Sequence, residues 1–189
     1  MSLWLGVLGS SLLAGGDFEA IATVNVGSGG ASSIEFTSIP STFAHLQVRL
    51  LARSSYSQNE DSPGVRFNSD TGSNYAFHYL LGNESSAVAG GDPNRTSANL
   101  IQHVAGNTAP SNVFGATVID ILDYSDTSKN TTLRSIGGRD DNGSGVSAIG
   151  SGFWNDTSAV TSILIYAAGV SGNDWLEHTT AALYGIKAP

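Results

Sequence analysis

The sequence contains no cysteine, and that absence removes two kinds of stabilising chemistry. Disulfide bonds cannot form, and no thiolate is present to hold zinc or an iron–sulfur cluster. Stability is therefore expected to come from side-chain packing alone, whatever the redox state of the compartment.

Charged residues are also scarce, at 13% of the 189 residues. The eight Lys and Arg residues stand singly, while Asp and Glu number 16, so the formal net charge is −8. Nucleic acids and anionic lipid surfaces attract clusters of basic side chains, which this chain lacks. We therefore expect no nucleic-acid partner and no membrane partner.

Residues 1–17 form an apolar arm ahead of a polar chain. Its large apolar side chains are Leu3, Trp4, Leu5, Val7, Leu8, Leu12 and Leu13. The first basic residue is Arg49, so the basic start of a secretory signal is missing, and the apolar run over residues 3–14 is shorter than the roughly 20 residues of a membrane helix. We expect an anchoring arm that docks on a neighbouring subunit. Packing against its own domain and a processed targeting segment are the alternatives.

Residues 18–189 show the alternation of half-buried β-strands. In "HLQVRLLAR", residues 45–53, Leu46, Val48 and Leu50 point to one side, and Gln47 and Arg49 point to the other. Similar runs are predicted as strands at 18–26, 32–39, 64–68, 75–81, 98–105, 113–124, 131–138, 146–154, 160–168 and 180–187. Clusters of Gly, Asn, Asp, Ser and Pro separate these runs.

This pattern predicts an all-β fold, specifically a jelly-roll-like antiparallel β-sandwich with a short apolar N-terminal arm. The arm would cover residues 1–17 and the sandwich residues 18–189. No stretch after the arm has the 3.6-residue period of a helix, and no linker divides the chain into two folded domains.

Catalytic motifs are missing from the sequence. Its four histidines fall in no metal-binding spacing, no GxSxG nucleophile elbow is present, and no phosphate-binding GxxxxGK[ST] loop occurs. Asp120 and Asp123 in "VIDILDY" are expected on opposite faces of a strand, which places them poorly for joint acid–base chemistry. We expect that the protein is not an enzyme and binds no cofactor.

The best metal candidate is "RDDNGSG", residues 139–145. Asp140, Asp141 and Asn142 offer oxygen ligands for calcium, but the spacing is not that of an EF-hand loop. A DNG sequence between two strands is also a strong hairpin signal. The hairpin turn is the preferred interpretation, and calcium binding is the alternative.

Two tryptophans are candidates for glycan contact. Trp154 and Trp175 both lie close to polar turns, where an aromatic ring could stack on a sugar. Packing in the core or at an interface is the preferred interpretation for both.

Five segments carry a resemblance to a known family. They are "IPSTFAHLQVR" (39–49), "VRFNSDTGSNYAFHYL" (65–80), "VIDILDYSDTSKNTTLRS" (118–135), "SGFWNDTSAVTSILI" (151–165) and "ALYGIK" (182–187). In order and spacing they resemble a family of small structural proteins of tailed bacteriophages, common among aquatic phages and described as head decoration, tail or fibre proteins. The resemblance runs from about residue 18 to residue 187, and it implies no enzyme activity.

The resemblance and the composition together predict a virion structural protein on the exterior of the particle, made in the cytoplasm of the host bacterium. A capsid decoration or cement protein, anchored by its arm to the major capsid protein or to a tail or fibre component, is the first expectation. A tail-fibre or receptor-binding module for host-surface glycan is the alternative, and a glycan-active β-sandwich enzyme is the second alternative. By analogy with other jelly-roll virion proteins, we expect a homotrimer.

The missing metal spacing generates a prediction about chelation. Because the DNG segment is interpreted as a turn, excess EDTA should leave the thermal midpoint of unfolding unchanged within error, as measured by calorimetry. A loss of several degrees that calcium restores would instead identify the Asp140–Asp141–Asn142 segment as a metal site.

Overall fold

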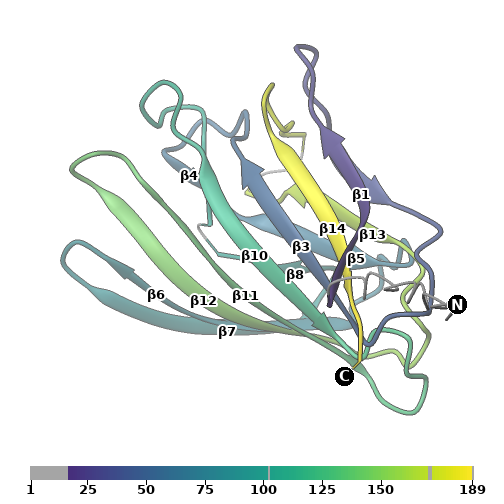
Figure 1. Ribbon diagram of the computed structural model, residues 1–189. Helices are drawn as coiled ribbons and strands as arrows, with labels where there is room; N and C mark the ends of the chain where they lie inside the picture. The colour runs from purple at the N-terminus through teal and green to yellow at the C-terminus, as the bar shows by residue number, and fades with distance from the viewer. Residues whose placement is uncertain (1–16, 102, 170–171, 189) are drawn as a thin grey trace, which may run out of the picture.

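The alternation of apolar and polar residues builds two packed β-sheets (Figure 1). The computed structural model describes residues 17–101, 103–169 and 172–188. Within these ranges every regular element is a strand, and the strand pairings in the sheets are antiparallel. The predicted all-β sandwich is therefore confirmed, whereas the jelly-roll connectivity stays a prediction. The described residues include no helix long and apolar enough to span a bilayer.

The larger sheet has eight strands. In spatial order they are β1 (Phe18–Asn25), β14 (Thr180–Ile186), β3 (His45–Ala52), β10 (Gly115–Leu122), β11 (Thr131–Asp140), β12 (Gly145–Trp154), β6 (Tyr75–Asn83) and β7 (Ala87–Arg95). The N-terminal and C-terminal strands lie side by side at one edge, and the β6–β7 hairpin forms the other edge (Figure 1).

The second sheet has four strands and packs against one face of the first. Its spatial order is β2 (Ser33–Phe36), β13 (Ile163–Ala167), β5 (Pro63–Phe67) and β8 (Ala98–Asn99). A separate pair, β4 (Glu60–Asp61) with β9 (Val104–Ala105), completes the architecture. The eight-stranded sheet thus has an inner face, toward the smaller sheet, and an outer face.

The core consists of alternate side chains from both sheets. On β3 the buried residues are Leu46, Val48 and Leu50, as their spacing predicts, and they belong to the same cluster as Ile163 and Ile165 of β13. Burial of such aliphatic side chains contributes roughly 1.5–3 kcal/mol each. Since the chain has no disulfide, this burial is the main source of stability.

Buried aromatic rings close one end of the core. The rings of Phe67 and Trp154 meet edge to face with centroids 5.6 Å apart, and Tyr75 stacks on Trp154 at 6.3 Å. The indole nitrogen of Trp154 donates to a carboxylate oxygen of Asp70 at 2.7 Å. This hydrogen bond and one from the Asn74 amide hold the pKa of Asp70 below its usual range.

Two strands escaped sequence prediction. β7 was assigned to a polar connection because it contains Gly90, Gly91 and Pro93, which are unfavourable in a central strand. It is an edge strand, where a proline is tolerated. β4 was also placed within a connection, and the single strand predicted at 98–105 is divided between β8 and β9 in different sheets.

The confirmed core generates a prediction about stability. Leu183 of β14 is 0% exposed, so Leu183→Ala should lower the free energy of unfolding by about 2–5 kcal/mol through lost burial and a cavity. Leu51, 44% exposed on the outer face of β3, is the matched control, and Leu51→Ala should cost less than about 1 kcal/mol. Urea denaturation of both variants measures the difference, and equal losses would contradict the placement of Leu183.

Candidate binding surface

The outer face of the eight-stranded sheet carries most of the exposed apolar side chains. Of the seven large hydrophobic residues exposed in the described part of the chain, six lie on this face. They are Phe18, Leu51, Leu80, Ile136, Ile149 and Phe153. The seventh, Val88, pairs in β7 with the buried Leu81. An apolar concentration of this kind on one face marks a contact surface more often than chance scatter.

Three of these residues, together with the partly buried Val118, form a continuous apolar ridge. Val118 of β10 pairs with Ile136 of β11, which pairs with Ile149 of β12, which in turn pairs with Leu80 of β6. Ile136, Ile149 and Leu80 are 61%, 52% and 48% exposed. Since neighbouring strands lie about 4.8 Å apart, the ridge crosses roughly 14 Å of sheet.

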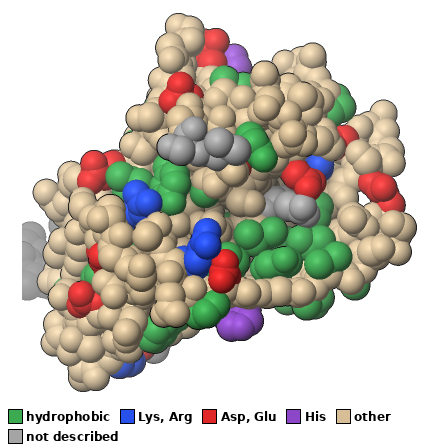
Figure 2. Space-filling view, turned by 180° about the vertical axis from the view of Figure 1, so that it is seen from behind, with side chains coloured by type: hydrophobic (Ala, Val, Ile, Leu, Met, Phe, Trp, Pro, Cys, Tyr) green, Lys and Arg blue, Asp and Glu red, His purple; other side chains and the backbone are tan. Residues whose placement is uncertain are grey.

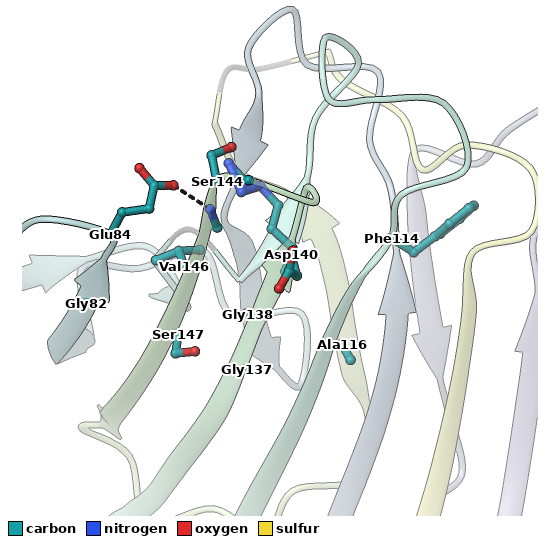
Figure 3. Close-up of a pocket in the computed structure, with 13 residues that line it drawn as sticks. Gly82, Glu84, Phe114, Ala116, Gly137, Gly138, Asp140, Ser144, Val146 and Ser147 are labelled. Atoms are coloured by element: carbon teal, nitrogen blue, oxygen red, sulfur yellow. Dashed lines mark hydrogen bonds between the residues drawn. The ribbon is translucent and has the colours of Figure 1, made fainter.

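A trough of small residues runs beside the ridge. Each of the four ridge strands has a small residue two positions from its ridge residue, and these small residues pair with one another from strand to strand. They are Ala116, Gly138, Ser147 and Gly82. They help to line an open depression of about 710 Å³ (Figure 3). Gly138 has φ +155°, and a Cβ there would lie 2.1 Å from the Val146 carbonyl oxygen, so the floor at this point requires glycine.

Two carboxylates form an acidic rim beyond the trough. Asp140 ends β11, and Glu84 lies in the turn between β6 and β7 (Figure 3). A Glu84 carboxylate oxygen accepts a hydrogen bond from the Gly145 backbone N–H at 2.7 Å, and Asp140 accepts one from the Asn142 N–H at 2.8 Å. Both side chains are thereby fixed at the loop end of the outer face.

A polar row borders the ridge on its other side. It consists of polar residues that pair with one another across consecutive strands. They are Gln47, Asp120, Arg134, Ser151 and His78. Asp120 accepts hydrogen bonds from the Gln47 amide at 2.9 Å and from Arg134 Nε at 3.0 Å. The outer face therefore has four parallel bands: acidic rim, small trough, apolar ridge and polar row.

A buried charge network supports the rim hairpin from the inner side. The guanidinium of Arg139 lies 3.1 Å from both Asp141 and Glu60, and its side chain and that of Asp141 are each 3% exposed. The Asn59 amide also donates to Asp141 at 3.0 Å. Sequence reasoning missed this network, because Asn59 and Glu60 lie about 80 positions before Arg139 and Asp141 in the chain. Only the fold, with β4 and β9 beneath the sheet, brings the two segments together.

The structure resolves the role of the candidate metal segment. Residues 141–144 form the predicted hairpin turn, with positive φ at Asn142 and Gly143 and a hydrogen bond from Asp141 N to Ser144 O at 2.7 Å. The Asp141 carboxylate is engaged by Arg139, whereas Asp140 points to the outer face. Among the described residues, no group of three His, Cys, Asp or Glu side chains could hold a metal ion.

Both candidate tryptophans for glycan contact lie in the core, as the preferred packing interpretation predicts. Trp154 is 1% exposed and Trp175 is 0% exposed, so neither ring presents a face to a sugar. Trp175 donates its indole N–H to the Ile165 carbonyl at 3.1 Å within the core. A polar turn close in the sequence therefore does not indicate that the neighbouring ring is exposed.

Asp120 and Asp123 do not form a catalytic pair. Asp120 belongs to the polar row, while Asp123 follows the end of β10 with φ +49° and binds the Lys129 ammonium at 2.5 Å. The predicted anchoring residues, Leu3, Trp4, Leu5, Val7, Leu8, Leu12 and Leu13, lie outside the described residues.

Comparison of the chain with protein-family models, with curated proteins and with solved structures found no match.

One histidine lies behind the trough. His103 is 1% exposed, and a Cβ on Gly137 would lie only 3.1 Å from its ring. Burial without a charge partner lowers the pKa of His103 from 6.5 to about 4. This histidine is consequently buried in its neutral form at neutral pH.

The lowered pKa of His103 generates a prediction about acid stability. Between pH 6.5 and 4 the unfolded chain binds a proton that the folded protein excludes, so stability falls as the pH falls, by about 3 kcal/mol in total. His103→Gln should lose this part of the pH dependence, whatever its effect on stability at pH 7. Urea denaturation at several pH values measures the slope, and His78→Gln, which changes an exposed histidine, is the control. Equal slopes in both variants would contradict the neutral, buried state.

Proposed function

We propose that this protein is a structural protein displayed on the exterior of a bacteriophage particle, and specifically a capsid decoration or cement protein. The observation that carries the proposal is the concentration of exposed apolar side chains on one sheet face of an otherwise polar sandwich. Such a surface suits permanent contact with other proteins. The resemblance of five sequence segments to phage structural proteins supports the viral assignment.

The charge distribution supports an exterior position. The net charge is −8, and packaged DNA would repel an acidic protein from the inside of a capsid. Figure 2 shows the side of the molecule opposite to that in Figure 1, where acidic and basic side chains stand singly or in small mixed groups within a mostly uncharged surface. A surface hydrated by hydroxyl and amide groups remains soluble without attracting nucleic acid.

The alternatives have less support from the described residues. A receptor-binding module for glycan would use accessible aromatic rings, but Trp154 and Trp175 are both in the core. A glycan-active enzyme would use two opposed carboxylates in a cleft, and Asp120 and Asp123 are committed to different ion pairs. We therefore propose a role in assembly and not in catalysis.

The apolar arm is the proposed attachment to the particle. Besides Met1, residues 1–17 contain seven large apolar side chains, and their single charged side chain is Asp17. At about 25 cal/mol per Å² of buried apolar surface, burial of half of the arm would contribute several kcal/mol. Its glycines allow it to follow a groove on a capsid or tail protein.

Substitutions in the arm test the proposal. Leu3→Ser, Trp4→Ser and Leu5→Ser combined should reduce the copies bound to particles that lack the protein by at least about tenfold, because this change removes apolar contact area. Ser10→Ala with Ser11→Ala is the matched control in the same arm and should bind normally. Bound copies are counted after sedimentation of the particles.

The fold must be measured in parallel, by thermal unfolding of each variant. Normal unfolding with lost attachment supports the anchor. Normal attachment of the triple variant would contradict it, and so would a failure of the triple variant alone to fold, since the arm would then belong to the core of its own domain.

A further inference from the structure

We propose that the outer face of the eight-stranded sheet binds a second copy of this chain, with the apolar ridge of each copy seated in the trough of the other. This inference uses the same apolar face that supports the proposed function, and it gives a dimer in place of the homotrimer expected by analogy. Contact between copies and attachment to a particle are tested separately. It starts from the parallel course of the ridge (Val118, Ile136, Ile149, Leu80) and the trough (Ala116, Gly138, Ser147, Gly82) on the same four strands.

The spacing of the two bands makes the face complementary to itself. Ridge and trough are two residues apart on each strand, about 7 Å. A two-fold axis in the plane of the interface, parallel to the bands and midway between them, places the ridge of one copy over the trough of the other. Ile136 then faces Gly138 of the other copy, and Ile149 faces Ser147. A contact in which both copies use the same patch is the usual way in which homodimers form.

The outer bands agree with the same axis. The rotation that exchanges ridge and trough also places the acidic rim of one copy over the polar row of the other. Because each strand keeps its position along the axis, Asp140 of β11 faces Arg134 of β11 in the other copy. Arg134 is 67% exposed and holds Asp120 only through Nε, so its guanidinium extends toward the partner. Glu84, which follows the end of β6, similarly faces His78 of β6 in the other copy, the last residue of the polar row.

The neutral centre of the face also suits a second copy. The eight residues of ridge and trough carry no charge, so no charged group is buried without a partner when two copies meet. Packed sheets lie about 10 Å apart, which leaves room for the central side chains of β11 and β12 to interdigitate. The contact thus has an apolar centre and a charged border, as stable interfaces have.

Other occupants explain the charge pattern less well. Residues 1–16 are apolar enough to cover the ridge, but they contain no charged side chain to face the rim or the polar row. A second copy supplies a trough to face the ridge, an acidic rim to face the polar row, and Arg134 to face Asp140.

The first test removes the apolar ridge. Ile136→Thr combined with Ile149→Thr keeps β-branched residues in both strands but replaces a methyl-rich surface with hydroxyl groups. Sedimentation equilibrium of the full chain should show a dimer for the unchanged protein and at least about tenfold weaker association for the double variant. Val88→Thr, which changes an exposed residue outside the outer face, should associate normally.

The second test exchanges the charges of one pair. Arg134→Glu and Asp140→Arg should each weaken the dimer by about threefold to tenfold, because the two-fold axis places two such pairs in every dimer. The combined variant should recover most of the loss. Within one chain these residues are six positions apart on an extended strand, about 20 Å, so recovery requires contact between copies.

Three results would overturn the inference. They are a monomeric unchanged protein at high concentration, a trimer whose association resists the ridge substitutions, and charge variants whose losses simply add. The particle assay keeps this inference separate from the proposed function. A ridge variant that is monomeric but still binds particles leaves the arm as the anchor, whereas an arm variant that dimerises but does not bind particles leaves the dimer intact.

Discussion

The packing of a four-stranded sheet against an eight-stranded sheet is the interaction on which the rest of the structure depends. It buries Leu46, Val48 and Leu183 from the large sheet together with Ile163 and Ile165 from the small one, with no disulfide to assist. Because side chains alternate along a strand, fixing the inner face fixes the outer face as well. A slip of one residue in any of the four ridge strands would turn its ridge residue inward and its core residues outward.

The organisation of the outer face follows from this constraint. Register places Ile136 between Val118 and Ile149 as strictly as it places Leu133 in the core. Buried Arg139 then holds the rim hairpin through Asp141 and Glu60, so the charged border is as well positioned as the apolar centre. The proposed contact between copies therefore requires no rearrangement of the sandwich.

Sequence reasoning found the class of fold and most of the strands, because alternation is a local property. It identified the turn at Asn142 and Gly143 for the same reason, since a DNG sequence is read within four residues. It could not find the ridge, because Leu80 and Ile149 become neighbours only when β6 and β12 pair. It also missed the Arg139 network, in which Glu60 comes from the two-residue strand β4 and Asn59 directly precedes that strand.

The edge strand β7 affects how copies of the protein can pair with one another when they are held close together. An open sheet edge offers unpaired backbone groups on which a further strand can grow, and copies held close together would otherwise polymerise edge to edge. In β7, Pro93 has no N–H to offer, and the ion pair between Asp92 and Arg95, 3.2 Å apart, adds charge at the same place. The strand that looks least like a strand in the sequence thus blocks growth of the sheet at this edge.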